Sequence, residues 1–330
     1  GWPQEKLAVS GFGLDVLRRV PGILSIRRAL RIQLLRERPD IFIGVDAPDF
    51  NLGLEASLRA QGIKTAHFVC PSIWAWRPQR VEKIRASADH VLCIFPFEPA
   101  LLARHGIAAS YVGHPLANLI PLEPDRVAAR SQLGLEQGAP VVALLPGSRR
   151  SEVQHLVHRF FAAAALMQKA LPAIKFIAPT IAALRPLVEQ AAQQAGLGSA
   201  LHVLEGQSHT ALEACDATLI ASGTATLEAA LYKRPMVIAY NMSRLSWHLM
   251  RRQQLQPWVG LPNILCGEFA VPELLQDAAT PRALADATLA WLADPVKTAA
   301  LQHRFTTLHL ELRRDTATLA ANAIEKVLAS

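Results

Sequence analysis

Cysteines, aromatic residues and charges are all scarce in this chain of 330 residues. The four cysteines stand far apart, with no CxxC pair and no cysteine–histidine cluster, so the sequence indicates neither a zinc module nor a disulfide framework. Charged residues make up 18% of the chain and hydrophobic residues 51%, a balance that excludes disordered, collagenous and acidic-tail proteins. We therefore expect a globular protein with sizeable cores in a reducing cytoplasm.

Long apolar runs are also missing. The most apolar region, around Leu219, is interrupted by Asp216 and Glu228, so no stretch reaches the roughly 18 to 20 residues that a membrane-spanning helix needs. Basic residues outnumber acidic ones, which gives a net charge of +7 and a sequence pI of about 9.5. This excess predicts an anionic partner: a nucleic acid, a membrane surface or a phosphorylated substrate.

From residue 40 onward, short β-branched or apolar runs alternate with alanine-rich helical stretches, which is typical of α/β proteins with parallel sheets. The segment 121–140, with three prolines and two glycines, predicts a linker between an N-terminal domain (1–120) and a second domain (141–295). After Pro272 the pattern is helical only, and we expect residues 296–330 to form helices that pack back toward the N-terminal domain. Strands are expected over residues 41–45, 65–70, 90–94, 110–112, 141–145, 174–178, 201–204, 217–221 and 236–240.

The first candidate site is a strand-to-helix turn, Gly147-Ser148-Arg149, after the predicted strand at 141–145. Such a turn presents backbone N–H groups and a helix N-terminus to an anion, Gly147 leaves room for close approach, and Arg149 adds a charge-assisted contact. Taken alone, the same residues fit a tight connection that binds nothing.

A second glycine turn, Ser222-Gly223-Thr224, follows the predicted strand at 217–221 and leads into a helix that carries Glu228. In the doubly wound strand order 3-2-1-4-5 the first and fourth strands are neighbours, which brings both turns to one crevice at the carboxyl ends of the strands. Neither turn is a Walker A or GxGxxG sequence, so a nucleoside diphosphate fits better than a dinucleotide or a hydrolysed triphosphate. Glu228 is a candidate for binding ribose hydroxyls, or an ordinary acid in the first helical turn.

Two acids, Asp46 and Asp49, follow the predicted strand at 41–45. A carboxylate at the carboxyl end of a strand lies where ligands of open α/β sheets bind, and it can act as a general base. The same two acids, three residues apart, are also able to ligate a metal or to cap the next helix. Spacing alone does not decide which of them acts.

Three further side chains are candidates for the acceptor side of a site. Trp74 and Trp76 stand together in a loop after a predicted strand, where they form either a structural cluster or an apolar wall for a ligand. His114 follows another predicted strand near the linker, and it is the histidine best placed to face a cleft.

Residues 7–38 are basic and amphipathic, with seven arginines between Arg18 and Arg38. A helix of this kind fits an anionic membrane surface, and it equally fits a helix that packs on its own domain and leaves a basic rim in solvent. Nucleic acid is not an expected partner, because the stretch lacks interleaved aromatic residues and recognition motifs. The apolar residues that share one helical face are Ile23, Ile26, Leu30 and Leu34.

Six blocks of the sequence form a recognisable set: residues 44–51, 71–76, 112–114, 145–149, 221–228 and 261–263. Together they resemble the lipid-A-disaccharide synthase family, and the likeness covers essentially the whole chain. The Asp-Ala-Pro-Asp-Phe-Asn and Pro-Ser-x-Trp-Ala-Trp blocks are specific, whereas the Gly-Thr-rich block recurs in many nucleotide-sugar enzymes. The family's N-terminal Gly-Glu-x-Ser-Gly-Asp turn is absent, so we expect an N-terminally truncated first domain.

The resemblance implies the GT-B architecture: two Rossmann-like doubly wound domains facing across a cleft, with C-terminal helices. It implies an inverting transfer from UDP-2,3-diacylglucosamine to 2,3-diacylglucosamine 1-phosphate (lipid X), which yields lipid A disaccharide 1-phosphate and UDP. Asp46 matches the family's essential acid, Arg149, Glu228 and Asn263 match UDP-site positions, and residues 7–38 match the membrane-docking region. No DxD motif is present, so we expect metal-independent catalysis and no cofactor.

Two alternatives stay open. One is another GT-B enzyme, a UDP-sugar epimerase or a peptidoglycan glycosyltransferase. An epimerase, however, acts on a soluble substrate and needs no basic amphipathic segment such as residues 7–38. The other is a non-catalytic UDP-binding protein of a membrane surface. The favoured interpretation places the protein in the cytoplasm, peripheral on the Gram-negative inner membrane. Its expected partners are the two acylated sugars and the anionic membrane. Assembly into a homodimer is left open.

Overall fold

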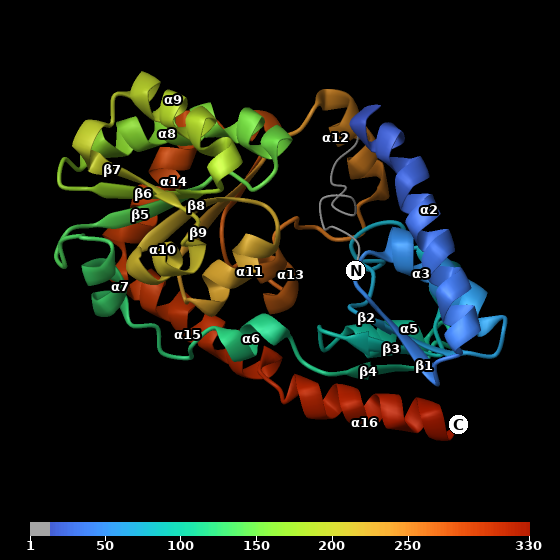
Figure 1. Ribbon diagram of the computed structural model, residues 1–330. Helices are drawn as coiled ribbons and strands as arrows, with labels where there is room; N and C mark the ends of the chain where they lie inside the picture. The colour runs from blue at the N-terminus through green and yellow to red at the C-terminus, as the bar shows by residue number, and fades with distance from the viewer. Residues whose placement is uncertain (1–13) are drawn as a thin grey trace. The chain divides into compact units, whose positions relative to one another are not determined.

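The computed structural model describes residues 14–330, and the chain divides into two compact units, each built on a parallel sheet (Figure 1). The first unit extends to Asn118 and also contains Gln253–Leu255 and Glu311–Ser330. The second unit comprises Leu119–Arg252 and Gln256–Leu310. The C-terminal segment therefore returns to the unit in which the described chain starts.

The sheet of the first unit has four parallel strands in the order β1-β2-β3-β4. They are β1 (Ile41–Val45), β2 (Lys64–Phe68), β3 (His90–Cys93) and β4 (Ala109–Tyr111). Each lies within two residues of an expected strand, because β-branched and apolar runs bounded by polar loops are a reliable signal for buried parallel strands. The helices of this part of the chain are α2 (Leu14–Glu37), α3 (Pro48–Arg59), α4 (Arg80–Ser87), α5 (Glu98–Ala103), α6 (Pro115–Leu119) and α16 (Thr316–Ala329).

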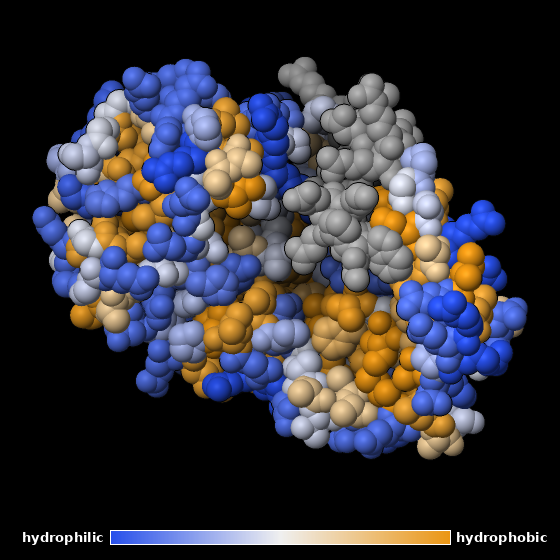
Figure 2. Space-filling view, viewed as in Figure 1, coloured by the Kyte–Doolittle hydropathy of each residue, from blue (hydrophilic) through white to orange (hydrophobic). Residues whose placement is uncertain are grey.

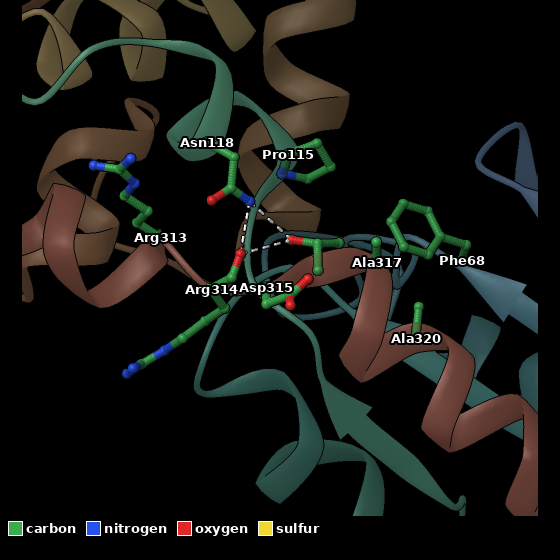
Figure 3. A pocket seen from close by; sticks show the side chains of 9 residues that line it. Phe68, Pro115, Asn118, Arg313, Arg314, Asp315, Ala317 and Ala320 are labelled. Atoms are coloured by element: carbon green, nitrogen blue, oxygen red, sulfur yellow. Dashed lines mark hydrogen bonds between the residues drawn. The ribbon is translucent and has the colours of Figure 1, made fainter.

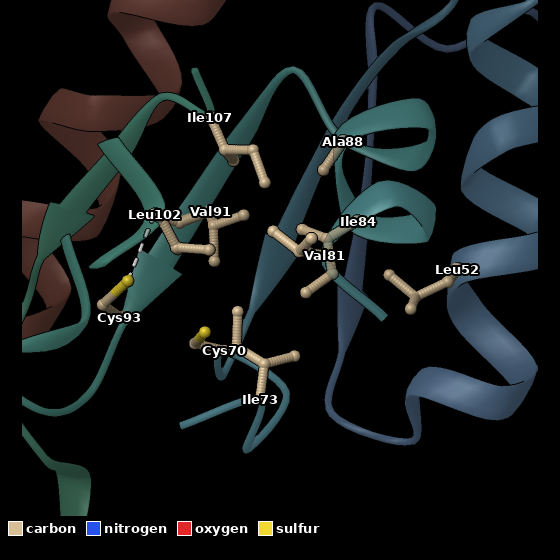
Figure 4. Packing of buried hydrophobic residues seen from close by; sticks show 10 residues of the cluster. All are labelled: Leu52, Cys70, Ile73, Val81, Ile84, Ala88, Val91, Cys93, Leu102 and Ile107. Atoms are coloured by element: carbon tan, nitrogen blue, oxygen red, sulfur yellow. Dashed lines mark hydrogen bonds between the residues drawn. The ribbon is translucent and has the colours of Figure 1, made fainter. Parts of the chain in front are cut away.

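The core of the first unit lies between its sheet and the helices that connect the strands. One buried cluster joins α3, α4, α5 and the loop after β2 (Figure 4), and it includes Leu52, Ile84, Val91 and Leu102. On α16, Ala323 packs with Leu92 and Val112, so this C-terminal helix covers strand residues of the same sheet. Burial of such side chains stabilises the unit by roughly 1.5 to 3 kcal/mol each.

The apolar face predicted for residues 7–38 packs against the protein where it is described. Ile26 is buried on α2, while Leu30 and Leu34 are half-buried against Leu54 and Leu58 of α3. Packing on its own unit therefore accounts for this face of the helix. Residues 7–13 lie outside the described part of the chain.

The second unit contains a six-stranded parallel sheet in the order β10-β9-β8-β5-β6-β7. Its strands are β5 (Val141–Leu145), β6 (Lys175–Thr180), β7 (Leu201–Glu205), β8 (Ala217–Ala221), β9 (Met236–Tyr240) and β10 (Glu273–Leu275). Numbered within the unit, the order is 3-2-1-4-5-6, which confirms the predicted 3-2-1-4-5 arrangement and adds a sixth strand. Every residue of β5 and β8 is buried, as in sheets covered by helices on both faces.

Helices cover the sheet of the second unit in two groups. α8 packs with α9 and α14, and α10 packs with α7 and α11. Right-handed crossovers on either side of β5 place these groups on opposite faces. The helices of this part are α7 (Arg126–Gln132), α8 (Arg150–Ala170), α9 (Arg185–Ala195), α10 (Ser208–Ala214), α11 (Thr224–Leu231), α12 (Arg244–Gln253), α13 (Leu261–Cys266), α14 (Pro281–Ala293) and α15 (Pro295–Leu312), with short 3₁₀ helices at Ala182–Leu184, Gly198–Ala200 and Gln276–Ala278.

Three expectations about the chain's organisation differ from the structure. The segment 121–140 is not a free linker: it belongs to the second unit and contains α7, whose buried Arg130 donates to the carbonyl of Ala214. The chain after Pro272 is not only helical, because β10 adds to the sheet edge beside β9. Residues 296–330 form two helices, and only the part from Glu311 belongs to the first unit.

No helix within residues 14–330 is long and apolar enough to cross a bilayer.

Candidate functional site

The turn after β5 bends on Gly147. Its φ of 127° lies in the region that favours glycine, and a Cβ at this position would lie 2.7 Å from the Cβ of Glu152. α8 begins at Arg150 directly after the turn, so the first N–H groups of the helix point toward the carboxyl edge of the sheet. The structure therefore places the glycine, Ser148, Arg149 and a helix N-terminus together.

A carboxylate of the chain itself occupies the donors of this turn. Glu152, in the first turn of α8, accepts hydrogen bonds from the backbone N–H groups of Ser148 and Arg149, each at 3.3 Å. The other oxygen of Glu152 accepts from Nη1 of Arg149 at 3.0 Å. Two N–H groups and a guanidinium thus converge on one anionic group, which is the donor set that a phosphate requires.

The second glycine turn lies beside the first, because β8 pairs with β5 in parallel. Gly223 has a φ of 156°, and α11 begins at Thr224 immediately after it. The hydroxyl of Ser222 donates to the carbonyl of Val259 at 3.1 Å. Two helix N-termini and two glycines therefore meet at the point where the strand order reverses, which is where open α/β sheets bind ligands.

Asn263 is fully buried, and its amide ties a loop together. Its Nδ2 donates to the carbonyl of Val271 at 2.9 Å and to the carboxylate of Glu273 at 2.8 Å, while its Oδ1 accepts from the N–H of Val271. Glu273 also accepts from the N–H groups of Val259 and Gly260. Asn263 therefore positions the segment that borders the second glycine turn.

Glu228 lies in the second turn of α11. The first turn of this helix holds no acidic residue, so the interpretation of Glu228 as a first-turn acid is wrong. Its carboxylate lies 3.7 Å from Nε2 of His209, and Nδ1 of His209 lies 3.2 Å from the hydroxyl of Tyr232. Burial raises the pKa of Tyr232 to about 12, so this phenol keeps its proton at neutral pH.

The turn after β1 uses non-glycine residues in the left-handed region. Asp46 and Ala47 have φ values of 50° and 41°, conformations that cost on the order of 1 to 3 kcal/mol each. Nδ2 of Asn51 holds the turn by donating to the carbonyls of Val45 at 3.0 Å and Asp46 at 2.8 Å. The N–H of Asp46 donates to the carbonyl of Phe68. The exposed Asp46 side chain thus stands on a strained but well-held turn.

Asp49, the second acid, is held by a cation. Nη2 of Arg80 lies 2.8 and 3.0 Å from the two carboxylate oxygens of Asp49. The same guanidinium lies 5.7 Å from the centre of the Trp76 ring, and Arg77 lies over that ring at 4.1 Å. The ion pairs among the described side chains do not include Asp46. The structure therefore distinguishes the two acids, which spacing did not.

Trp74 lies in a buried aromatic cluster. Its ring is buried and meets the rings of Phe95 and Phe97 edge-on, with centroid distances of 5.9 and 5.3 Å. Its Nε1–H donates to Glu98 at 2.9 Å. Burial raises the pKa of Glu98 to about 7, although the N–H groups of Phe95 and Trp74 favour the charged form.

His114 is buried at the end of β4. Its Nδ1 accepts from the N–H of Leu116 at 3.2 Å, which leaves the ring proton on Nε2, and burial lowers its pKa to about 4. The ring lies 5.6 Å from Phe95. His114 is therefore neutral at pH 7, so it can donate a hydrogen bond but carries no charge.

A cavity of about 890 Å³ opens at the carboxyl edge of the first unit's sheet (Figure 3). Phe68 ends β2 on one side of it, and Pro115 follows His114 on another. Nδ2 of Asn118 donates to the carbonyl of Arg314 at 2.7 Å, which joins the chain segments around the cavity. Apolar side chains and two arginines share the lining. The lining residues are Phe68, Pro115, Asn118, Arg313, Arg314, Asp315, Thr316, Ala317 and Ala320.

One group within residues 14–330 has the composition of a metal site. The ligand atoms of Cys70, Cys93 and Glu98 lie within 4.8 Å of one another, a cluster that their spacing in the sequence did not indicate. Both cysteines belong to the apolar core of Figure 4, and a hydrogen bond with Cys70 and burial raise the pKa of Cys93. Both oxygens of Glu98 already accept hydrogen bonds. These thiols therefore behave as core side chains.

Comparison with known proteins identifies the family. The model of the lipid-A-disaccharide synthetase family matches residues 2–327. The lipid-A-disaccharide synthase of Albidiferax ferrireducens is 69% identical over 331 residues, which cover 99% of this chain and 85% of that protein. The corresponding enzyme of Burkholderia pseudomallei is 54% identical and covers 100% and 84%. The chain belongs to the lipid-A-disaccharide synthetase family.

Solved structures confirm the GT-B fold. A putative UDP-N-acetylglucosamine 2-epimerase from Listeria monocytogenes superposes with a TM-score of 0.63 at 14% identity, covering 94% of this chain and 79% of that one. UDP-GlcNAc 2-epimerase from Neisseria meningitidis gives a TM-score of 0.62 at 12% identity, covering 95% and 82%. At these identities the likeness shows the fold alone. The match to the lipid-A-disaccharide synthetase family means that the alternatives, another GT-B enzyme or a non-catalytic UDP-binding protein, are not favoured.

Sequence reasoning missed several residues that shape the site. Glu152 fills the first glycine turn, and its position three residues after Arg149 is the spacing of a helix cap. Glu273 supports the loop of Asn263 from a strand of only three residues, too short to show alternation. Phe68 is the last residue of β2, and an aromatic residue in a strand gives no sequence signal that separates a binding role from a packing role.

Proposed function

We propose that this chain transfers 2,3-diacylglucosamine from UDP to the 6-hydroxyl of 2,3-diacylglucosamine 1-phosphate, with inversion and without a metal. Membership of the family makes it a disaccharide-forming glycosyltransferase. The observation that carries the assignment of roles is the pair of adjacent glycine turns at the switch point of the second unit's sheet.

The two glycine turns hold the UDP diphosphate in this proposal. The Ser148 and Arg149 N–H groups and the Arg149 guanidinium exchange the Glu152 carboxylate for phosphate oxygens. The turn of Ser222, Gly223 and Thr224 supplies a second helix N-terminus. Fixed donors of this kind stabilise the charge that builds on UDP as it leaves.

Glu228 binds the ribose of UDP in this proposal. Its carboxylate accepts hydrogen bonds from ribose hydroxyls, and His209 and Tyr232 hold it in place. Asn263 acts as a positioning residue, since its amide is engaged by Val271 and Glu273. It keeps the adjoining loop in the shape that the nucleotide needs.

Asp46 is the general base. Its carboxylate takes the proton of the acceptor hydroxyl, the hydroxyl oxygen bonds to C1 of the donor sugar, and the C1–oxygen bond to UDP breaks with its electron pair leaving on UDP. The strained turn supports this role, because strain that the surroundings must maintain is typical of functional residues. Asp49 is less suited, since Arg80 already engages both of its oxygens.

The acceptor lies in the cavity of Figure 3 in this proposal. Phe68 supports the placement, because its ring lines the cavity while its carbonyl accepts from the N–H of Asp46. The apolar lining suits acyl chains, and Arg313 and Arg314 suit a phosphate. His114 and Trp76 stand at the same sheet edge and shape the acceptor side, with Trp74 behind them.

The protein works on the cytoplasmic face of the inner membrane, as a peripheral protein that docks through residues 7–38. Exposed basic and apolar side chains on α2 support this part of the proposal. A homodimer stays a prediction, and light scattering after size-exclusion chromatography measures it.

Release of UDP tests the function directly. The chain is incubated with both acylated sugars in detergent, and UDP and the disaccharide are quantified with and without EDTA. We expect UDP and disaccharide in equal amounts, only when both sugars are present, and no loss of rate with EDTA. UDP release from the donor alone, or the absence of disaccharide, would contradict the proposed transfer. A loss of rate with EDTA would contradict metal independence.

A further inference from the structure

A groove on the first unit gathers three arginines on one side of α2. Its volume is about 310 Å³, and α3 forms its other side. Arg27 and Arg31 are one helical turn apart, and Arg28 lies between them on the same side of the helix. The lining residues are Leu24, Arg27, Arg28, Arg31, Gly53, Leu54 and Ser57.

Among the side chains that the structure describes, no carboxylate forms an ion pair with these three arginines. The ion pairs among the side chains described from residue 21 onward involve none of Arg27, Arg28 and Arg31. Their nearest polar contact is weak: Nη1 of Arg27 lies 3.5 Å from the carbonyl of Asp49. Like charges three and four residues apart destabilise a helix, so a ligand that carries negative charge would relieve this repulsion.

Gly53 makes room for such a ligand. A Cβ at this position would lie 3.0 Å from Nη1 of Arg27, so the absence of a side chain lets the guanidinium reach the floor of the groove. The planar guanidinium groups match the oxygens of a phosphate, which they can bind in pairs. The charge of the groove therefore fits a phosphate group.

Exposed apolar side chains lie on the same side of the helix. Leu24 is 45% exposed and Ile32 is 57% exposed, and both are one turn from Arg28. On the opposite face Ile26 is buried, and Leu30 packs against residues of α3. The surface over α2 accordingly mixes hydrophobic and hydrophilic residues (Figure 2). Leu24 and Ile32 are therefore free to enter the acyl region of a bilayer while the arginines meet its headgroups.

We propose that the groove formed by Arg27, Arg28, Arg31 and Gly53 is a binding site for the phosphate headgroup of an anionic membrane phospholipid. The site deepens the membrane docking in the proposed function and rests on it. The phosphate of the acylated acceptor has the same chemistry, but the exposed Leu24 and Ile32 flank the groove in the way that a bilayer requires. The acceptor already has a cavity with two arginines of its own.

Sedimentation with vesicles tests this site. The vesicles contain phosphatidylcholine with or without about one fifth phosphatidylglycerol, at low and moderate salt. Arg28→Gln with Arg31→Gln is compared with Lys83→Gln with Arg104→Gln, which removes the same charge from exposed positions outside both the groove and residues 7–38. Since each arginine near an anionic surface contributes about a factor of five in binding, we expect the groove pair to lower partitioning at least tenfold and the control pair at most threefold.

The outcomes separate the site from the docking. If the parent chain ignores phosphatidylglycerol, membrane docking itself is wrong. If the parent binds and both pairs lose affinity equally, docking stands but the groove is not a site. If the groove pair raises the KM for the acceptor in phospholipid-free detergent, the phosphate belongs to the acceptor and the proposal fails.

A second variant fills the groove without changing its charge. Gly53→Leu places a side chain against Nη1 of Arg27, whereas Gly53→Ala adds only a Cβ that a small shift of the flexible arginine accommodates. We expect several-fold weaker vesicle binding for Gly53→Leu and nearly parental binding for Gly53→Ala, with equal UDP affinity in both. Equal vesicle binding by Gly53→Leu and the parent would show that no phospholipid headgroup occupies the groove when the protein is on the membrane.

Discussion

The turn after β5 in the second unit and the turn after β1 in the first unit both follow a parallel strand and lead into a helix, yet they bend the chain with different residues. The turn after β5 bends at Gly147, which has a φ of 127°. The turn after β1 bends at Asp46 and Ala47, which have φ values of 50° and 41°. Glycine makes such a backbone without strain, whereas alanine adopts it only at a cost and aspartate at a smaller one.

This difference matches the two roles in the proposed function, in which the turn at Gly147 binds the diphosphate and the turn at Asp46 presents the base. A turn that wraps backbone N–H groups around a phosphate needs open space, and Gly147 supplies it because any Cβ would meet Glu152. A turn that presents a base needs a side chain at a fixed position, and strain at Asp46 is balanced by the two hydrogen bonds from Asn51. Three variants test this division of labour.

Asp46→Asn is expected to have the largest effect. Because the amide cannot take the acceptor proton, turnover should fall roughly 10²-fold or more while UDP affinity and thermal stability stay near parental values. The measurement is kcat for UDP release together with calorimetry of UDP binding.

Asp49→Asn is the matched control for this variant. It removes the ion pair with Arg80, so we expect a smaller loss of turnover. The assignment of the base is wrong if Asp49→Asn loses more turnover than Asp46→Asn, or if Asp46→Asn loses UDP affinity to the same degree as turnover.

Arg149→Ala comes second. Loss of a charged hydrogen bond to the diphosphate should weaken UDP binding by about 1.5 to 3 kcal/mol, measured by calorimetry. Arg150→Ala is the control, since it removes the same charge from the neighbouring exposed position. Equal weakening by both variants would mean that only the general positive field matters, and unchanged affinity in Arg149→Ala would remove this residue from the site.

The same contrast explains how far the sequence predicts the structure. In the second unit the order of the strands and the place of both glycine turns follow from buried apolar runs and from glycine, which are visible in the sequence. In the first unit the strained turn is invisible, because nothing local in Asp-Ala-Pro-Asp predicts positive φ for the first two residues. The ion pair of Asp49 with Arg80 joins residues 31 positions apart, so only the fold reveals it.

Burial and tertiary contacts also separate residues that the sequence pattern treats alike. Trp74 and Trp76 are two residues apart in sequence, yet Trp74 is buried and donates to Glu98, whereas Trp76 is half-buried and lies near two arginines. The strand β10 has only three residues, and the carboxylate of its first residue, Glu273, accepts a hydrogen bond from the distant Asn263. Such tertiary contacts override weak local signals.

Ala47→Gly should have the smallest effect, and its sign separates strain from ordinary packing. Glycine relieves a left-handed conformation that costs alanine roughly 1 to 2 kcal/mol, while its greater freedom in the unfolded chain costs about 0.4 to 1 kcal/mol. The thermal midpoint should therefore stay level or rise by the equivalent of up to about 1 kcal/mol. Ala56→Gly, inside α3, is the control and should lower stability by about 1 kcal/mol, because its backbone is already helical. If both variants lose stability alike, the turn at Asp46 stores no strain, and the contrast between the two turns lies in their side chains alone.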